Sequence, residues 1–300
     1  MKREPGELLV DLVPPERGMR SVLAHRLDAA SIGASQEGCW VVEEQALRVE
    51  VQDVGHYTLM CTPTGSLEAS GYLRQDGVLG EAGEPGALAL AAGFLLTEGL
   101  IDAMGEVASM AVCPESSSVV RVRLVDPARA HSTRRSGVVA SSCGMCANVE
   151  GLVALGGDGL RVASTLVLGA AQVHRHMQTM RARQAIFART GGTHACALFD
   201  AGGTLLALAE DLGRHNALDK VIGHCLLHGV SSAGGCVLLS GRVSLEMVTK
   251  AARAGIELVA AVSAPSSMAI SAAQQVGITL CGFVRGDRLT AFSHPQRLRA

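Results

Sequence analysis

Apolar runs and helical patterns alternate over the second half of the chain, and this alternation constrains the fold more than any other feature of the sequence. An apolar run at 258–262 is followed by a helical pattern at 267–276 and by a second apolar run at 278–283. Glycines follow three of the predicted helices, where a left-handed residue commonly ends a helix; they are Gly229, Gly255 and Gly277. Strands that alternate with helices predict an α/β fold with a layered mixed sheet.

The other elements of this half follow from the same two periodicities. Strands at 194–199 and 205–209 flank the stretch Asp200-Ala-Gly-Gly203, which predicts a hairpin turn. A single long helix is expected from Leu166 to Ala188, because apolar residues recur along one face of it. The remaining predicted elements are helices near 216–227 and 244–254 and a strand at 236–239.

The first half of the chain predicts a smaller, β-rich region. Apolar and charged residues alternate at 47–51 and at 120–124, which is the pattern of half-buried strands. A helix is expected from Ala87 to Thr97, and the Gly- and Ser-rich stretch 62–85 is expected to be an exposed loop. Four parts are therefore predicted: an irregular N-terminal tail at 1–38, a β-rich subdomain at 39–140, a mobile loop and linker at 141–160, and an α/β domain at 161–300.

Composition and charge exclude several classes of protein. Apolar residues make up 48% of the chain and charged residues 18%, which favours a packed core over disorder. A net charge of -2 predicts no strong attraction to nucleic acid or to an anionic membrane. The longest uncharged stretch, 258–284, contains Pro265 and two glutamines, so no membrane segment is expected, and no secretory signal is recognised. Together with nine mostly scattered cysteines, these features predict a protein of the reducing cytoplasm.

The motif Cys143-Gly144-Met145-Cys146 carries the candidate catalytic residues, Cys143 and Cys146. Two thiols at this spacing can share a metal, form a disulfide, or supply a nucleophile with a resolving neighbour. A structural zinc site needs four ligands, and the sequence has no second Cys-x-x-Cys. Serine and glycine surround the motif, which predicts a mobile loop. A mobile thiol suits a sulfur relay, but the spacing alone leaves the alternatives open.

Three predicted strand-to-helix corners could bind a ligand. They contain the stretches Ser240-Gly241-Arg242, Ser263–Ser267 and Gly213–Asn216. In an open α/β sheet, ligands bind beyond the carboxyl ends of the strands, and helix N-termini offer N–H groups to phosphate. Ordinary helix capping accounts for each corner alone, whereas the three together favour a phosphate-bearing ligand. The sequence has no P-loop and no Gly-x-Gly-x-x-Gly fingerprint, so ATP hydrolysis and ordinary NAD binding are unsupported.

Several histidines require an interpretation. His215 lies at one of the corners and is a candidate for catalysis or cofactor binding. Asp219 and Lys220 follow it and are equally consistent with the solvated face of a helix. His174 and His176 are two residues apart on a predicted helix, so their side chains point to opposite sides and cannot chelate one metal. His174 and His176 are therefore expected to be ordinary solvent-exposed side chains.

A series of ordered motifs resembles that of one known family. The motifs are Ala91–Ile101, Cys143–Cys146, Arg189–His194, Glu210–Lys220, Ser240–Met247, Ala260–Pro265, Cys281–Arg288 and His294–Arg297. The series extends over about 40–298 and resembles the FdhD family, sulfur carrier proteins required for formate dehydrogenase activity. One departure is Ala147, which stands where the family usually has a glycine after the second cysteine.

The resemblance implies a fold, a reaction and partners. The C-terminal part would resemble cytidine deaminase. Cys143 would accept a persulfide sulfur from a cysteine desulfurase and pass it to the bis-molybdopterin guanine dinucleotide cofactor, which formate dehydrogenase then receives. The family also implies a homodimer.

The resemblance also implies a cofactor-contacting segment near the C-terminus. It consists of Phe283, Val284, Arg285, Gly286, Asp287 and Arg288. The two arginines can pair with phosphate, and the glycine permits close backbone approach; without the resemblance, the segment predicts a hairpin turn. With the corner residues Ser240, Gly241, Arg242 and His215, this segment forms the predicted cofactor site.

Three other functions are weighed against the sulfur carrier. A zinc deaminase needs His-x-Glu and Pro-Cys-x-x-Cys, but Ala195-Cys196 follows His194 and Ser142 precedes Cys143, so no metal site is expected. A cofactor chaperone that moves no sulfur would still activate the dehydrogenase after Cys143→Ala. A zinc-binding interaction protein would carry stoichiometric zinc when purified.

Overall fold

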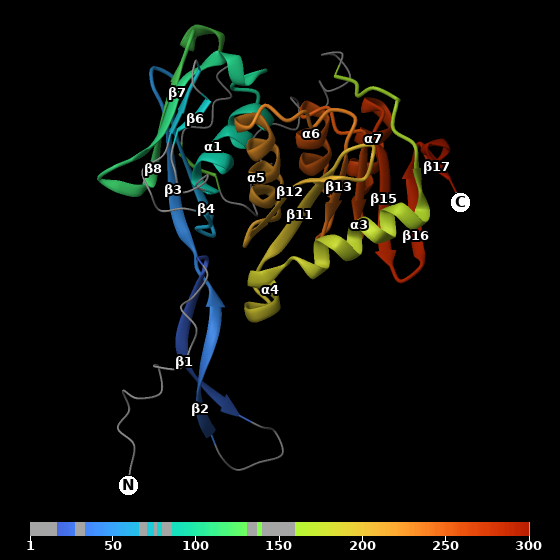
Figure 1. Cartoon of the computed structure of the whole chain (residues 1–300), viewed down its shortest axis with the longest axis horizontal. Coiled ribbons are helices and arrows are strands. Elements are labelled where there is room, and N and C mark those ends of the chain that lie inside the picture. Colours follow the sequence, from blue (N-terminus) through green and yellow to red (C-terminus); the bar gives the residue numbers. More distant parts are fainter. Residues whose placement is uncertain are drawn as a thin grey trace.

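The computed structural model of the chain describes residues 17–27, 34–65, 71–74, 77–79, 86–130, 137–139 and 160–299 (Figure 1). The described residues form two main sheets, one in each half of the chain. Short pieces complete the architecture: an isolated parallel pair, β10 (Leu168–Gly169) with β17 (Leu298–Arg299), and 3-10 turns at Met104–Glu106, Pro127–Arg129 and Pro295–Arg297. None of the helices in this part of the chain combines the length and apolar character that a membrane crossing needs.

The six-stranded sheet of the C-terminal half has the order β12-β11-β13-β14-β15-β16. Its strands are β11 (His194–Phe199), β12 (Leu205–Asp211), β13 (Cys236–Leu239), β14 (Leu258–Ala261), β15 (Thr279–Arg285) and β16 (Arg288–Ser293). The central strands β13, β14 and β15 are parallel, and antiparallel hairpins extend the sheet on both sides. The mixed α/β architecture predicted from the alternation of elements is confirmed; the finer likeness to cytidine deaminase stays a prediction.

Helices cover both faces of this sheet because its buried strands are apolar on both sides. One face packs on α5 (Arg214–Leu227), α6 (Leu245–Arg253) and α7 (Ser267–Val276), and the other on α3 (Ala170–Ala182). The predicted helices at 216–227, 244–254 and 267–276 correspond to α5, α6 and α7. Gly277 adopts a positive φ of 85° directly after α7, which is the predicted reason for a glycine there.

A seven-stranded sheet forms the β-rich N-terminal region, in the order β6-β5-β7-β8-β3-β4-β9. The strands are β3 (Gln45–Val51), β4 (Gly55–Cys61), β5 (Gly71–Leu73), β6 (Gly77–Leu79), β7 (Val107–Cys113), β8 (Ser116–Leu124) and β9 (Gly137–Val139). The alternating patterns at 47–51 and 120–124 lie on β3 and β8, as predicted. The stretch 62–85 is not simply an exposed loop, since it contains β5 and β6 and begins with the buried Thr62.

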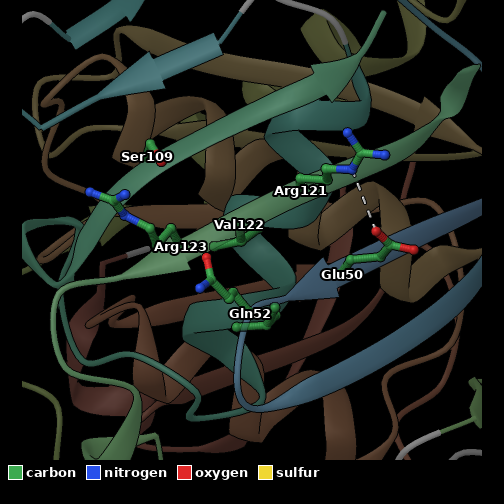
Figure 2. Close-up of a pocket in the computed structure, with 7 residues that line it drawn as sticks. Glu50, Gln52, Ser109, Arg121, Val122 and Arg123 are labelled. Carbon is green, nitrogen blue, oxygen red and sulfur yellow. Dashed lines mark ion pairs between the residues drawn. The ribbon is translucent and has the colours of Figure 1, made fainter. Parts of the chain in front are cut away.

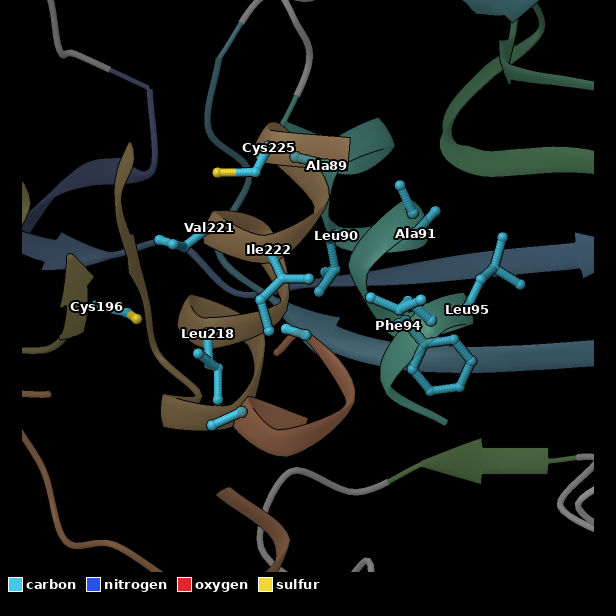
Figure 3. Close-up of a cluster of buried hydrophobic side chains, with 14 of the residues drawn as sticks. Ala89, Leu90, Ala91, Phe94, Leu95, Cys196, Leu218, Val221, Ile222 and Cys225 are labelled. Carbon is cyan, nitrogen blue, oxygen red and sulfur yellow. The ribbon is translucent and has the colours of Figure 1, made fainter. Parts of the chain in front are cut away.

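The two regions are joined by an unusually close pair of helices, α1 (Gly86–Thr97) and α5 (Figure 3). Leu90 and Phe94 from α1 and Leu218 and Ile222 from α5 belong to one hydrophobic core, which continues into both sheets. Gly93 lies against the backbone of Asp219, and Gly223 against the backbone of Ala89. With no side chain at the crossing, the two backbones approach to a distance that any Cβ atom would prevent.

The segments 19–27 and 34–42 form a long antiparallel strand pair, called the hairpin below, which projects away from the rest of the molecule (Figure 1). Strand β1 (Met19–Leu27) pairs antiparallel with β2 (Ala34–Val42). The expectation of an irregular tail up to residue 38 is therefore wrong for this segment. Met19 is buried at the base, whereas Leu23 and Leu27 are 65% and 76% exposed. Because most of its side chains face solvent, the sequence of the hairpin shows little of the apolar–polar alternation that indicates a strand.

The single helix expected from Leu166 to Ala188 is also wrong. Helix α3 ends at Ala182, and a second short helix, α4 (Ala185–Thr190), follows. The carboxylate of Glu210, on β12, accepts hydrogen bonds from the N–H groups of Ile186 (2.8 Å) and Phe187 (2.9 Å). This distant carboxylate satisfies the first amides of α4, so a new helix begins where the apolar pattern alone predicts that the old one continues.

Candidate functional site

The predicted corners of the α/β domain meet at the carboxyl edge of the parallel strands. Strand β11 is antiparallel to β13, with Cys196 opposite Leu239, so His194 at the start of β11 lies at the edge where β13 ends. An isolated bridge between Val243 and Pro265 joins the corner after β13 to the corner after β14. The edge of an open α/β sheet is where ligands bind, and here the topology brings distant motifs to it.

The corner Ser240-Gly241-Arg242 is held tightly against β11. The Ser240 hydroxyl accepts a hydrogen bond from the N–H of Ala195 at 2.9 Å. A Cβ atom on Gly241 would lie 3.1 Å from Nδ1 of His194, so this glycine lets the corner pass over the imidazole. Arg242 is exposed. The three predicted residues therefore form one rigid turn with a positive charge directed to solvent.

His194 is not among the residues predicted for the site, and Arg214 enters the prediction only as part of the corner Gly213–Asn216, although both lie within motifs of the family series. Burial lowers the pKa of His194, the positive charges of Arg214 and Arg242 lower it further, and Asp211 partly opposes them. The pKa of Arg214 is also lowered, by burial and by Arg242, while Glu246 raises it. The side chains of His194 and Arg214 both lie within 4 Å of the position that a Cβ atom on Gly241 would take, directly before Arg242 in the chain. What marks these two residues is their proximity in space to the other motifs, and this proximity cannot be read from the sequence.

His215 lies behind this cluster and is only 7% exposed. Its Nε2 atom is 3.3 Å from a carboxylate oxygen of Glu246 and 3.4 Å from the hydroxyl oxygen of Ser244. These contacts join the N-terminal turn of α5 to that of α6. The structure thus places His215 at the predicted sheet edge. Its contacts there hold Ser244 and Glu246, which follow the corner 240–242 in the chain.

The segment 283–288 begins at the same edge and then leaves it. The N–H of Phe283 donates to the carbonyl of Ser263 (3.2 Å), and Nε of Arg285 donates to the carbonyl of Val262 (3.1 Å). Phe283 is 45% exposed, with a positive φ of 55°. Val284, by contrast, is fully buried in the core beneath α3, so its side chain cannot face a ligand at the surface.

The remainder of this segment is a tight turn between β15 and β16. Gly286 has a φ of 58°, as a left-handed turn residue requires. Asp287 and Arg288 are almost fully exposed and form a loose ion pair of 3.9 Å. The hairpin interpretation is therefore correct for the backbone, and the exposed arginines Arg285 and Arg288 are available to an anion in solution.

Cys143 and Cys146 lie outside the described residues, but the chain on both sides of their segment is anchored. Before it, β9 pairs in parallel with β4 through Tyr57–Leu59. After it, the N–H of Val162 donates to the carbonyl of Val276. The segment thus connects an edge of the β-rich sheet to the α/β domain.

Glu257 and Arg297 hold the chain where it enters the α/β domain. The Glu257 carboxylate accepts hydrogen bonds from the N–H groups of Thr165 and Leu166 (both 2.8 Å) and from the Thr165 hydroxyl (2.7 Å). Arg297 donates to the carbonyl of Ala163 at 3.1 Å. Burial raises the pKa of Glu257, but these hydrogen bonds and the charge of Arg297 outweigh it, so the pKa lies below its ordinary value.

Glu257→Gln should lower the free energy of unfolding by about 1–3 kcal/mol at neutral pH, because an amide cannot accept all of these hydrogen bonds. A folded-state pKa below the ordinary value means that ionised Glu257 stabilises the fold above pH 4.5, and that this stability disappears as the pH falls through the folded pKa. Urea unfolding at pH 7 and pH 4 measures this. A difference between variant and wild type that grows on acidification would contradict the assignment.

Two buried ion networks connect α5 to the N-terminal region. Lys220 Nζ is 2.8 Å from Asp211 and donates to the carbonyl of Thr62 at 2.8 Å. Lys250 Nζ is 2.9 Å from Asp219, which also accepts from the Thr97 hydroxyl at 2.8 Å. The interpretation of Asp219 and Lys220 as a solvated helix face is wrong, since both are below 4% exposed. Such charges are buried only because each has its partner.

The remaining cysteines and histidines show no metal site in the described part of the chain. Six of the seven cysteines there are buried, as predicted for small apolar residues, and Cys39 is half-buried. No group of three or more potential metal ligands occurs among the described residues. The prediction of a solvated histidine pair is wrong for His176, which is 7% exposed and stacks on Phe199 with ring centroids 4.1 Å apart.

A shallow groove of about 400 Å³ crosses the outer face of the seven-stranded sheet (Figure 2). Arg121, Arg123, Gln52 and Ser109 line it, and Arg121 pairs with Glu50 at 3.6 Å. The opposite side chains of β3 and β8 face the core at α1. This outer face is polar, and none of the predicted site residues lies on it.

The fold and the sheet edge define a class: a mixed α/β protein in which a cysteine-bearing segment joins a β-rich region to an α/β region whose sheet edge carries exposed arginines. The chain belongs to the FdhD/NarQ family, whose sequence profile matches residues 85–299. It is 35% identical over 278 residues to the sulfur carrier protein FdhD of Bordetella bronchiseptica, which covers 92% of this chain and 93% of that protein. It is 39% identical over 221 residues to the protein of the same name from Thermoplasma acidophilum, covering 70% of this chain and 74% of the relative.

A solved structure has the same fold. The crystal structure of a putative formate dehydrogenase accessory protein from Desulfotalea psychrophila superimposes with a TM-score of 0.67. The match covers 95% of this chain and 100% of the other, at 22% sequence identity. At that identity the likeness concerns the fold.

Proposed function

We propose that this protein is a sulfur carrier that loads a persulfide on Cys143 and delivers the sulfur to the bis-molybdopterin guanine dinucleotide cofactor for formate dehydrogenase. The observation that carries the proposal is the family membership, together with relatives that are named sulfur carrier proteins over nearly their whole length. The convergence of Ser240–Arg242 with Phe283–Arg285 at one sheet edge supports it, because this edge suits the anionic cofactor.

The loading step is an exchange of the kind that governs disulfides. The Cys143 thiolate attacks the terminal sulfur of a persulfide on a cysteine desulfurase. A new S–S bond forms on Cys143, the S–S bond on the desulfurase breaks, and the desulfurase cysteine leaves as a thiolate. The carrier then holds a sulfane sulfur. When this sulfur passes to the cofactor bound as substrate, the S–S bond on Cys143 breaks, Cys143 leaves as a thiolate, and a reduced cofactor would supply the two electrons that convert the sulfur to sulfide.

The cofactor would bind through its phosphates. Arg242, Arg285 and Arg288 are exposed and positively charged, and guanidinium groups bind phosphate with two parallel hydrogen bonds. Phe283 presents an exposed ring beside them, which can cover a flat heterocycle. Of the predicted segment, Val284 contributes packing beneath the site and no side-chain contact.

Intact-mass measurement after incubation with a cysteine desulfurase and cysteine tests the loading step. The wild-type chain should gain the mass of one sulfur atom, which a thiol reductant removes. The gain should be absent in Cys143→Ala and present in Cys39→Ala, a matched control at a half-buried thiol on the projecting hairpin. A gain that persists in Cys143→Ala, or that appears in no variant while the desulfurase itself is loaded, would refute the proposal.

A further inference from the structure

Arg214 carries a charge that the described part of the protein does not neutralise directly. Its Nε atom is buried, and it has no hydrogen-bond partner among the described residues. A buried guanidinium N–H without an acceptor is costly, and native proteins normally supply one. Glu246 is the carboxylate whose charge raises the pKa of Arg214. Its oxygen lies 3.3 Å from Nε2 of His215. An anionic ligand would supply the acceptor that the described residues do not provide.

Further positive and neutral donors surround Arg214 at the sheet edge. His194 and Arg242 lie close enough for the two guanidinium groups to lower the pKa of the imidazole. Asp211, directly opposite His194 on β12, partly offsets this effect, but its carboxylate is bound to Lys220 at 2.8 Å and to the N–H of Thr62 at 3.0 Å. The local balance of charge therefore favours an added anion.

The backbone shape also leaves room at this point. A Cβ atom on Gly241 would lie 3.1 Å from Nδ1 of His194 and 3.7 Å from Cδ of Arg214, so only a glycine leaves both side chains uncovered. Helix α6 begins just beyond this corner, and the Ser244 side chain makes no capping hydrogen bond to its first amides. Helix N-terminal amides add to the attraction for a negative group.

We propose that His194, Arg214 and Arg242 form an anion subsite that binds a pyrophosphate group. Two guanidinium groups beside a third donor match a group that carries more than one negative charge. The identity of the ligand rests on the proposed function, because each half of a dinucleotide cofactor contains a pyrophosphate. The subsite deepens that function, since it assigns a second point of attachment besides the segment 283–288.

Binding of the anion should be linked to protonation of His194. In the free protein burial, Arg214 and Arg242 lower the pKa of this imidazole, which favours the neutral ring. A bound pyrophosphate offsets the two positive charges and favours the imidazolium form, which raises this pKa. The complex should therefore take up a proton and become tighter as the pH falls toward the pKa of free His194.

NMR titration of the histidine side chains with inorganic pyrophosphate tests the subsite in the full chain. The expected result is a rise in the pKa of His194 at saturating pyrophosphate. At constant pH, added pyrophosphate should leave the ring signals of His56, an exposed residue of β4, in place. Arg214→Gln and, as a surface variant that leaves the core intact, Arg242→Gln should each weaken pyrophosphate binding by about tenfold or more. Arg123→Gln, an exposed arginine on the distant sheet face, should leave it unchanged.

The outcomes separate this inference from the proposed function. Pyrophosphate binding that is equal in wild type, Arg214→Gln and Arg242→Gln, or an unchanged pKa of His194, would overturn the subsite even if Cys143 still gains sulfur. Loss of sulfur loading with intact pyrophosphate binding would overturn the carrier function and leave the subsite standing.

Discussion

Cys143→Ala should abolish the activation of formate dehydrogenase, with activity about 100-fold or more below that supported by the wild-type protein. The thiolate is the nucleophile that takes up sulfur, and alanine cannot form an S–S bond. The basic sheet edge does not depend on this side chain, so binding of the cofactor should survive. The measurement is formate-dependent dye reduction in cells that lack their own carrier and express the variant.

This prediction separates a carrier from a chaperone. A protein that only binds and delivers the cofactor would activate the dehydrogenase equally well with alanine at position 143, and that result would refute sulfur transfer. Cys39→Ala, at a half-buried thiol on the projecting hairpin, is the control and should support full activity. Cys146→Ala assigns the second cysteine: a persulfide that forms but does not activate the dehydrogenase would show that Cys146 acts after loading.

Gly93→Ala should lower the free energy of unfolding by about 3 kcal/mol or more. The added Cβ would overlap the carbonyl oxygen of Asp219, which is backbone and cannot rotate away. Helices α1 and α5 would have to move apart, which would open the shared core around Leu90, Phe94 and Ile222 (Figure 3). Packed interiors do not accommodate such a shift without loss of contacts.

Chemical denaturation of matched variants measures this effect. Gly105→Ala, on a short 3-10 turn where an added Cβ meets no atom within 4 Å, should leave the free energy of unfolding within about 0.5 kcal/mol of wild type. If Gly93→Ala does not accumulate as folded protein while Gly105→Ala does, the close crossing is confirmed. Equal stability of the two variants would show that α1 and α5 do not approach as described.

The local patterns of the sequence were sufficient for most elements near the site. Helix α7 was predicted at its observed bounds, because Ser266 caps it, Gly277 ends it and the residues between repeat at helical spacing. Strand β14 and the corner after it followed from an apolar run that Pro265 ends. These signals are short-range, so they need no knowledge of the rest of the chain.

The motif series was equally informative about the family. Ordered motifs such as Glu210–Lys220 and Ser240–Met247 identified the family, and the match over 85–299 confirms it. Their roles were not readable from order alone. Val284 was placed in the cofactor segment by its position in a motif, whereas strand alternation turns its side chain into the core under α3.

Sequence by itself determined the class of fold and the family, because periodicity, caps and motifs are encoded by residues close together in the chain. Only the tertiary structure decided that Glu210 starts a new helix at Ala185, that Asp219 and Lys250 meet inside the core, and that Arg214 lies beside His194. Each of these depends on residues brought together from distant parts of the chain. Their energies come from burial and paired charge, which exist only after the chain has folded.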